Sequence, residues 1–199
     1  DTFHLLGRAF AAFLGPGTVA VTRDMRVSSP SLTKAFIDGV TLQGVDVHDG
    51  GLAGTDMMYY AVASAGLMGG AQITASHNPK QYNGCKMVKA EAFPLSGESG
   101  IREMKEMLLT NSLPAPSARR GTVTPITIMA PYVDHVMGFI DPTVIQSFNT
   151  VLDAGSGIAG LVAPHLFDRL PCRTTKLCFE VDGTFPNHEA NPLLEENRE

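Results

Sequence analysis

The chain has 199 residues, of which 44% are hydrophobic and 18% charged, a composition typical of a globular protein with a buried core. Its net charge of −5, without a block of like charges, argues against a nucleic-acid-binding surface or a surface for anionic membranes. No apolar run reaches the length of a membrane span, and the three widely spaced cysteines indicate neither a disulfide framework nor a zinc site, so we expect reduced thiols and a cytoplasmic protein.

The first part of the chain alternates between predicted helices and strands. Apolar residues at helical spacing predict an amphipathic helix over 5–13 rather than a signal peptide, and Gly15-Pro16-Gly17 ends it. The elements that follow are, in chain order, a buried strand over 18–22, a helix over 29–43, a strand and loop over 45–51, a helix over 56–68 and a strand over 71–76. This alternation implies right-handed crossovers and an α/β fold with a mixed, largely parallel sheet flanked by helices.

The rest of the chain predicts the end of this domain, a linker and the start of a similar α/β domain. A strand over 86–90 and an amphipathic helix over 98–111 complete the first domain. Residues 112–125 contain three prolines and little periodicity, so we divide the chain into domains at 1–126 and 127–199. The second unit is predicted to hold a helix over 129–141, a strand over 148–154, a glycine loop over 155–160, a helix over 158–170, a strand over 174–181 and an extended polar end. Two strands are few for a buried sheet, so we expect the chain to stop inside its second domain.

Ser76 stands where a predicted strand ends, and Asn78-Pro79 requires a turn directly afterwards. A serine on such an edge is exposed enough to act as a nucleophile or to carry a phosphate. Because neighbouring strand side chains point to opposite faces, we expect no hydrolase-like pair between Ser76 and His77. Asn83-Gly84 favours a tight hairpin turn that would return Lys86 towards the serine, where a cation suits an anionic substrate or a phosphoserine. A plain surface turn with a solvated lysine is the alternative.

Four segments resemble, in order, motifs of the α-D-phosphohexomutases, the superfamily of the bacterial phosphomannomutase/phosphoglucomutase enzymes. TASHNP followed by YNG and a lysine is similar to the phosphoserine loop of that family. TRDMRVSSPSL resembles its GRDxRxSSP segment, VLDAGSGIAG the first strand and loop of its domain 2, and VDGTFPNHEANP a domain 2 stretch that reads DGxFPNHxPNP. The likeness runs from about Thr22 to Asn197, and YNG favours the phosphomannomutase/phosphoglucomutase branch.

The resemblance implies an enzyme that moves a phosphate between the C1 and C6 oxygens of a hexose, mannose or glucose, through a bisphosphorylated intermediate. By the match, Ser76 carries the phosphate, Lys86 is the general acid/base, and His77 and Asn78 shape the phosphate site. The implied cofactor is Mg²⁺, bound through the phosphate of Ser76 and otherwise by a DGDxDR loop expected beyond residue 199. Phosphoryl transfer consists mostly of positioning and charge neutralisation, which such a cation supports.

The sequence also departs from the family pattern. The amino-terminal YDIRG-like segment, the metal loop and the two last domains of the family are absent from these residues, so we expect this chain by itself to be an inactive fragment. Thr22 replaces the usual glycine, and we assign Arg23 and Asp24 structural roles, as a buried pair at the end of a strand.

Two other functions remain open. GSGIAG at 155–160 is a GxGxxG pattern between a strand and a helix, with Glu180 about 20 residues beyond it, as in dinucleotide-binding oxidoreductases; tight strand–helix packing would explain the same glycines without a cofactor. A non-catalytic truncated binding domain would also keep an intact Ser76. Five histidines each stand alone in the sequence, and we expect core or surface roles and no metal site for them: His4, His48, His135, His165 and His188.

Overall fold

The computed structural model describes residues 2–189, 191 and 195. Its larger part is a six-stranded sheet of order β5-β4-β3-β1-β2-β6. The strands are β1 (Thr18–Arg23), β2 (Asp46–Leu52), β3 (Gly69–Ile73), β4 (Cys85–Lys89), β5 (Phe93–Pro94) and β6 (Val123–Pro125). β1 pairs in parallel with β2 and β3, and β2 with β6, whereas β4 pairs antiparallel with β3 and β5. The predicted mixed, largely parallel sheet is therefore confirmed.

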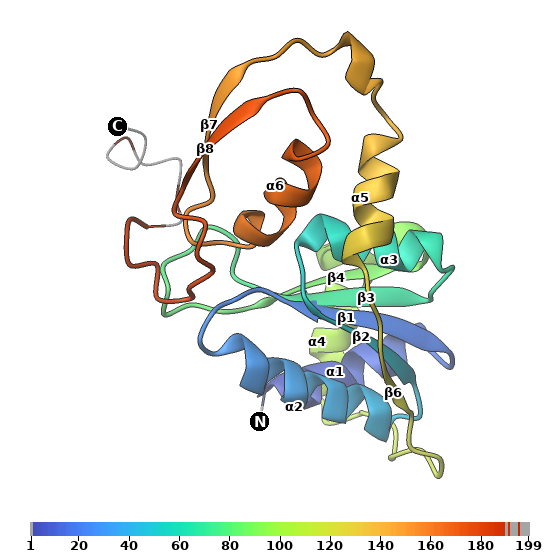
Figure 1. Cartoon of the computed structure of the whole chain (residues 1–199). Helices are drawn as coiled ribbons and strands as arrows, with labels where there is room; N and C mark the ends of the chain where they lie inside the picture. Colours follow the sequence, from blue (N-terminus) through green and yellow to red (C-terminus); the bar gives the residue numbers. More distant parts are fainter. Residues whose placement is uncertain (1, 190, 192–194, 196–199) are drawn as a thin grey trace.

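Helices cover both faces of this sheet (Figure 1). One face packs against α1 (Thr2–Leu14), α2 (Ser29–Leu42) and α4 (Arg102–Leu109), and the other against α3 (Thr55–Ser64) and α5 (Met129–Met137). Alternating residues of β1 supply the two cores: Val19 and Val21 belong to the α1–α2 side, and Ala20 belongs to the α3 side. Short turns of 3-10 helix at Ala90–Ala92 and Pro142–Val144, and a π-helical turn at Gly97–Ile101, connect the longer elements.

Helices α1 and α2 approach each other closely because glycines face each other's backbone. A methyl group at Gly7 would overlap the carbonyl oxygen of Phe36, and one at Gly39 would overlap the carbonyl oxygen of His4. The two glycines therefore allow both helices to pack side by side on the sheet, with Phe10 and Phe36 in ring contact between them.

A second, smaller sheet consists of β7 (Asn149–Asp153) and β8 (Arg173–Leu177), paired in parallel and connected by α6 (Ala159–Phe167). Figure 1 shows this unit in orange and red, above the six-stranded sheet and to the left of α5. Val151 and Leu177 are exposed, and none of the residues of α6 is buried. A two-stranded sheet with one helix buries little apolar surface, as the sequence predicted for this part of the chain.

Three local predictions are wrong. β6 forms inside the segment 112–125, where we expected only a linker, because these residues pair with the open edge of β2. The strand predicted over 71–76 ends at Ile73. Asn83-Gly84 is not a two-residue hairpin turn, since the loop 74–84 joins β3 to β4; the Asn83 amide instead donates hydrogen bonds to the hydroxyls of Ser28 and Ser29, both at 2.9 Å. Among the described residues, no helix combines the length and the apolar character of a membrane span.

Candidate active site

The loop 74–84 presents Ser76 just beyond the carboxyl end of β3. Ser76 is exposed and has a left-handed backbone, with φ of 57°, which is uncommon for a residue other than glycine. Its amide donates to the Thr74 hydroxyl at 3.0 Å, and its own hydroxyl oxygen lies 3.4 Å from Nδ1 of His77. The expectation that Ser76 and His77 point to opposite faces is therefore wrong, because both lie in a turn where strand alternation no longer applies.

Arg26 is fully buried and holds the backbone of this loop. Its two terminal nitrogens donate to four loop carbonyl oxygens: those of Ser76 (2.7 Å), Asn78 (2.8 Å), Pro79 (2.9 Å) and Tyr82 (3.1 Å). Its Nε donates to the Asp24 carboxylate at 3.1 Å, so every guanidinium N–H has an acceptor. Arg26 was not among the predicted site residues, although it lies in the segment TRDMRVSSPSL.

Asp24 connects Arg26 to the start of α2 and to Thr74, the first residue of the serine loop after β3. Its buried carboxylate accepts hydrogen bonds from the Ser29 hydroxyl at 2.6 Å and the Thr74 hydroxyl at 2.7 Å, besides the amide and Nε of Arg26. The partner of Asp24 is thus Arg26 rather than Arg23, whose Nε is buried and has no hydrogen-bond partner among the described residues. The charged pair sits behind the serine loop and fixes its conformation.

A cleft of about 420 Å³ opens beside Ser76, between the six-stranded sheet and the smaller unit. Gln72, Thr74 and Ser76 line it on one side, and Asp153 and His188 on the other. The loop 74–84 and the segment 179–189 lie next to each other, at the left of Figure 1, and Phe185 and Glu189 of that segment also line the cleft. Ser76 therefore faces a space that both polar and apolar side chains line, the apolar ones including Met25, Ile158 and Phe185.

Lys86 lies on β4 directly opposite Gln72 of β3. Opposed residues of an antiparallel pair project from the same face of the sheet, so Lys86 lies on the face of the cleft, although it is not among the residues that line it. It is exposed, and within the described part of the chain its ammonium group makes no hydrogen bond or ion pair. Asn78 does not point into the cleft: its side-chain amide donates to the Ala75 carbonyl at 2.8 Å and stabilises the turn.

Across the cleft, Asp153, Cys178 and His188 form the one group of three possible metal ligands that occurs among the described residues. Burial would raise the pKa of Asp153, but hydrogen bonds from the Gly155 amide and from His188 bring it below its ordinary value. The Glu189 carbonyl and the Asp153 carboxylate raise the pKa of His188. His188, which stands alone in the sequence, thus meets two other possible metal ligands in the structure. Mg²⁺ prefers oxygen ligands, and of these three side chains only the Asp153 carboxylate provides oxygen, so the described residues do not by themselves form a magnesium site.

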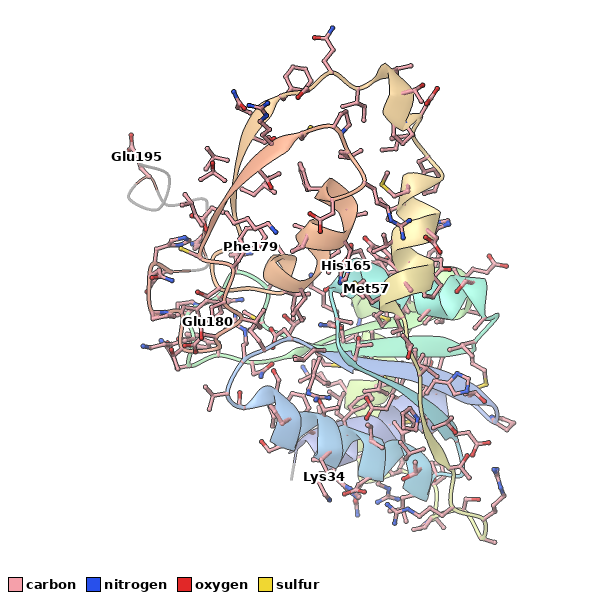
Figure 2. All side chains as sticks on the ribbon, in the orientation of Figure 1. Lys34, Met57, His165, Phe179, Glu180 and Glu195 are labelled. Atoms are coloured by element: carbon pink, nitrogen blue, oxygen red, sulfur yellow. The ribbon has the colours of Figure 1, made fainter. Side chains whose placement is uncertain are left out.

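The glycine loop at 155–160 is explained by packing. A methyl group at Gly160 would overlap the carbonyl oxygen of Phe179, so glycine lets α6 approach the segment after β8. Ser156 is buried, with its amide donating to the Cys178 carbonyl at 2.8 Å. Glu180 is exposed and does not line the cleft; Figure 2 labels it and Phe179 in the segment after β8. The arrangement does not favour a dinucleotide site.

Comparison with known proteins matches both parts of the chain to one family. Residues 1–112 match Phosphoglucomutase/phosphomannomutase, alpha/beta/alpha domain I, and residues 130–199 match domain II of the same family. The chain is 39% identical to a phosphomannomutase of Escherichia coli, over 100% of this chain and 45% of that relative. It is 35% identical to the phosphohexose mutases of Xanthomonas campestris pv. campestris (strain B100), over 100% of this chain and 44% of that relative.

A solved structure agrees with these matches. An X-ray crystal structure of a phosphoglucomutase/phosphomannomutase family protein from Burkholderia thailandensis aligns with a TM-score of 0.87 at 32% identity, over 99% of this chain and 44% of that chain. The chain therefore spans about 45% of the length of the curated relatives that it matches.

Proposed function

Because the chain belongs to the phosphoglucomutase/phosphomannomutase family, we propose that it carries the phosphoserine part of a phosphohexomutase site, which moves a phosphate between the C1 and C6 oxygens of one hexose. The observation that carries the proposal is the position of Ser76: an exposed hydroxyl in a loop held by the buried Arg26, facing a cleft. A rigid, exposed oxygen is what a group carrier needs, since phosphoryl transfer depends on positioning.

In the proposed reaction, a sugar hydroxyl attacks the phosphorus atom carried by Ser76. The bond from phosphorus to the seryl oxygen breaks as the bond to the sugar oxygen forms, which produces a bisphosphorylated hexose. The other phosphate of that sugar then returns to Ser76 by the same exchange. Lys86, unpaired among the described residues and on the face of the cleft, exchanges the proton of the hydroxyl that gains or loses the phosphate.

The other residues of the loop support this exchange. His77, with Nδ1 3.4 Å from the seryl oxygen, is placed to contact a phosphate there, whereas Asn78 keeps the turn in shape. A Mg²⁺ ion held through the phosphate of Ser76 stays a prediction and would need ligands besides the described residues; we derive no step through it. The phosphorylated hexose as substrate, the cytoplasmic location and the domain boundary after residue 126 also stay predictions.

The test is loading of the serine, the half-reaction that the loop around Ser76 would carry out, and not the complete interconversion, for which we expect this chain by itself to be inactive. The 199-residue chain is incubated with glucose 1,6-bisphosphate and Mg²⁺, and its intact mass is measured. We expect the mass of one added phosphoryl group on the unmodified chain and on Ser112→Ala, which removes another exposed serine, and none on Ser76→Ala. Loading should be slower for Lys86→Met than for Lys89→Met, because Lys89 projects from the opposite face of β4.

Two results would contradict the proposal. One is an unmodified chain that never gains a phosphoryl group, which would favour a binding domain without catalysis. The other is equal loading of Ser76→Ala. Saturable quenching or enhancement of NADH fluorescence by the chain would instead support the dinucleotide-binding alternative.

A further inference from the structure

The fold brings three ligating side chains from separate segments to one point. Asp153 ends β7, and Cys178 directly follows β8, where Asp153 pairs with Leu177. The carboxyl ends of two neighbouring parallel strands thus place the carboxylate and the thiol side by side. His188 joins them from the segment after β8, with Nε2 at 3.0 Å from the Asp153 carboxylate. The three ligand atoms all lie within 4.8 Å of one another.

Hydrogen bonds to the other atoms of these side chains orient them towards a common centre. Oδ1 of Asp153 accepts the Gly155 amide at 2.8 Å, which leaves Oδ2 facing His188. Nδ1 of His188 lies 3.0 Å from the Glu189 carbonyl oxygen and can keep its proton there, while a metal ion would replace the proton that Nε2 shares with the Asp153 carboxylate. A ligating histidine whose second nitrogen donates to a carbonyl is a common arrangement in metal sites.

The buried Ser156 holds the surrounding backbone together. Its amide donates to the Cys178 carbonyl at 2.8 Å, and its carbonyl accepts the Asp182 amide at 3.0 Å. Its hydroxyl accepts a hydrogen bond from the Asn187 side chain at 3.3 Å. The segments that carry Cys178 and His188 are thus both attached to the loop that follows Asp153, so the ligand group does not depend on one flexible side chain.

We propose that Asp153, Cys178 and His188 form a Zn²⁺-binding site, separate from the Mg²⁺ expected at the phosphoserine. Zinc accepts thiolate, imidazole and carboxylate together, and three protein ligands plus water complete its tetrahedron. With ligand bonds of about 2.0–2.3 Å, the ligand atoms of such a site lie roughly 3.3–3.6 Å apart. The present separations need changes on the order of 1 Å to reach this geometry. Since Asp153 and His188 line the cleft, the water position would face it.

The experiment uses the reduced, metal-free 199-residue chain and Co²⁺ as a coloured substitute for Zn²⁺. We expect a thiolate-to-cobalt charge-transfer band that Zn²⁺ abolishes and that excess Mg²⁺ leaves unchanged. Cys178→Ser should remove the band, and His188→Gln or Asp153→Asn should weaken Co²⁺ binding about tenfold or more. Cys172→Ser, which removes another free and half-buried thiol of the same unit, should keep both the band and the affinity.

A second measurement needs no variant and so does not depend on whether the variants fold. The unmodified chain is alkylated with iodoacetamide, and each modified cysteine is identified by peptide mass spectrometry. Zn²⁺ should slow the alkylation of Cys178 and leave that of Cys172 unchanged. The proposal is overturned if no band depends on Cys178, if Cys172→Ser loses the band equally, or if Zn²⁺ does not slow the alkylation of Cys178. Loading of Ser76 tests the phosphohexomutase proposal separately.

Discussion

Replacing Arg26 with methionine tests whether a buried guanidinium determines the conformation of the serine loop. The substitution keeps an apolar stem of similar length and removes every donor to Asp24 and to the loop carbonyls. The Asp24 carboxylate, buried behind the loop, would keep only the amide of residue 26 and the hydroxyls of Ser29 and Thr74 as donors.

The magnitude follows from what remains without a partner. Removing one member of a buried ion pair costs about 3–5 kcal/mol, because the other charge is left in a site that water does not reach. The loop carbonyls add less, since Ser76 and Asn78 are exposed and water can replace the lost donors. We expect Arg26→Met to lower the free energy of unfolding by about 3–5 kcal/mol, a large share of the roughly 5–15 kcal/mol of a typical domain.

The assay is urea unfolding followed by far-ultraviolet circular dichroism, with hydrogen exchange of the amides in residues 74–84 as a local readout. Arg26→Lys keeps the charge but not the planar guanidinium group, so its free energy of unfolding should lie between those of the unmodified chain and Arg26→Met. Arg102→Met removes an exposed arginine of α4 and should change the free energy of unfolding by less than about 0.5 kcal/mol. A loss below about 1 kcal/mol for Arg26→Met, with unchanged exchange in the loop, would refute the reasoning.

Three further predictions concern packing and titration. Gly39→Ala should lower the free energy of unfolding in urea by about 1–3 kcal/mol, since its methyl group would overlap a carbonyl of α1, whereas Gly97→Ala, in open space, should change it by less than about 0.5 kcal/mol. The Thr122 amide and a nearby arginine lower the pKa of Asp46 to about 2 from 3.8, so the stability that this carboxylate contributes is present above pH 3.8 and is lost as the pH falls towards 2. Asp46→Asn should therefore lower the melting temperature at pH 5, and the melting temperatures of the variant and of the unmodified chain should converge as the pH falls to about 2. A difference in melting temperature that stays constant between these pH values would contradict this. Burial and the Asp56 carboxylate of α3 raise the pKa of Tyr132, so this tyrosine should ionise last as the pH rises. Tyr132→Phe should therefore remove the most alkaline step from a titration of tyrosine absorbance. A titration curve that keeps this step would argue against the contact between Tyr132 and Asp56.

Much of the fold was predictable because its signals are local. Apolar residues at helical spacing, the glycine–proline breaks and the short buried runs predicted α1 to α3 and β1 to β3 in order, and the segment around Ser76 indicated the serine loop. The Asn83-Gly84 turn was wrongly predicted because a longer-range interaction prevails, as Asn83 binds two hydroxyls at the start of α2. β6 was missed because a strand of three residues has too little periodicity to detect and forms by pairing with an existing edge.

The sequence by itself determined the order of helices and strands, the family motifs and the identity of the candidate phosphate carrier Ser76. Only the tertiary structure decided that Arg26 is buried against the serine loop, and that Cys178 and His188 meet Asp153. An arginine in a polar segment is ordinarily exposed, and a single histidine or cysteine carries no pattern of its own. These contacts join residues far apart in the chain. They form only when the parallel strands bring their carboxyl ends to one edge of each sheet, where the cleft lies between the two sheets.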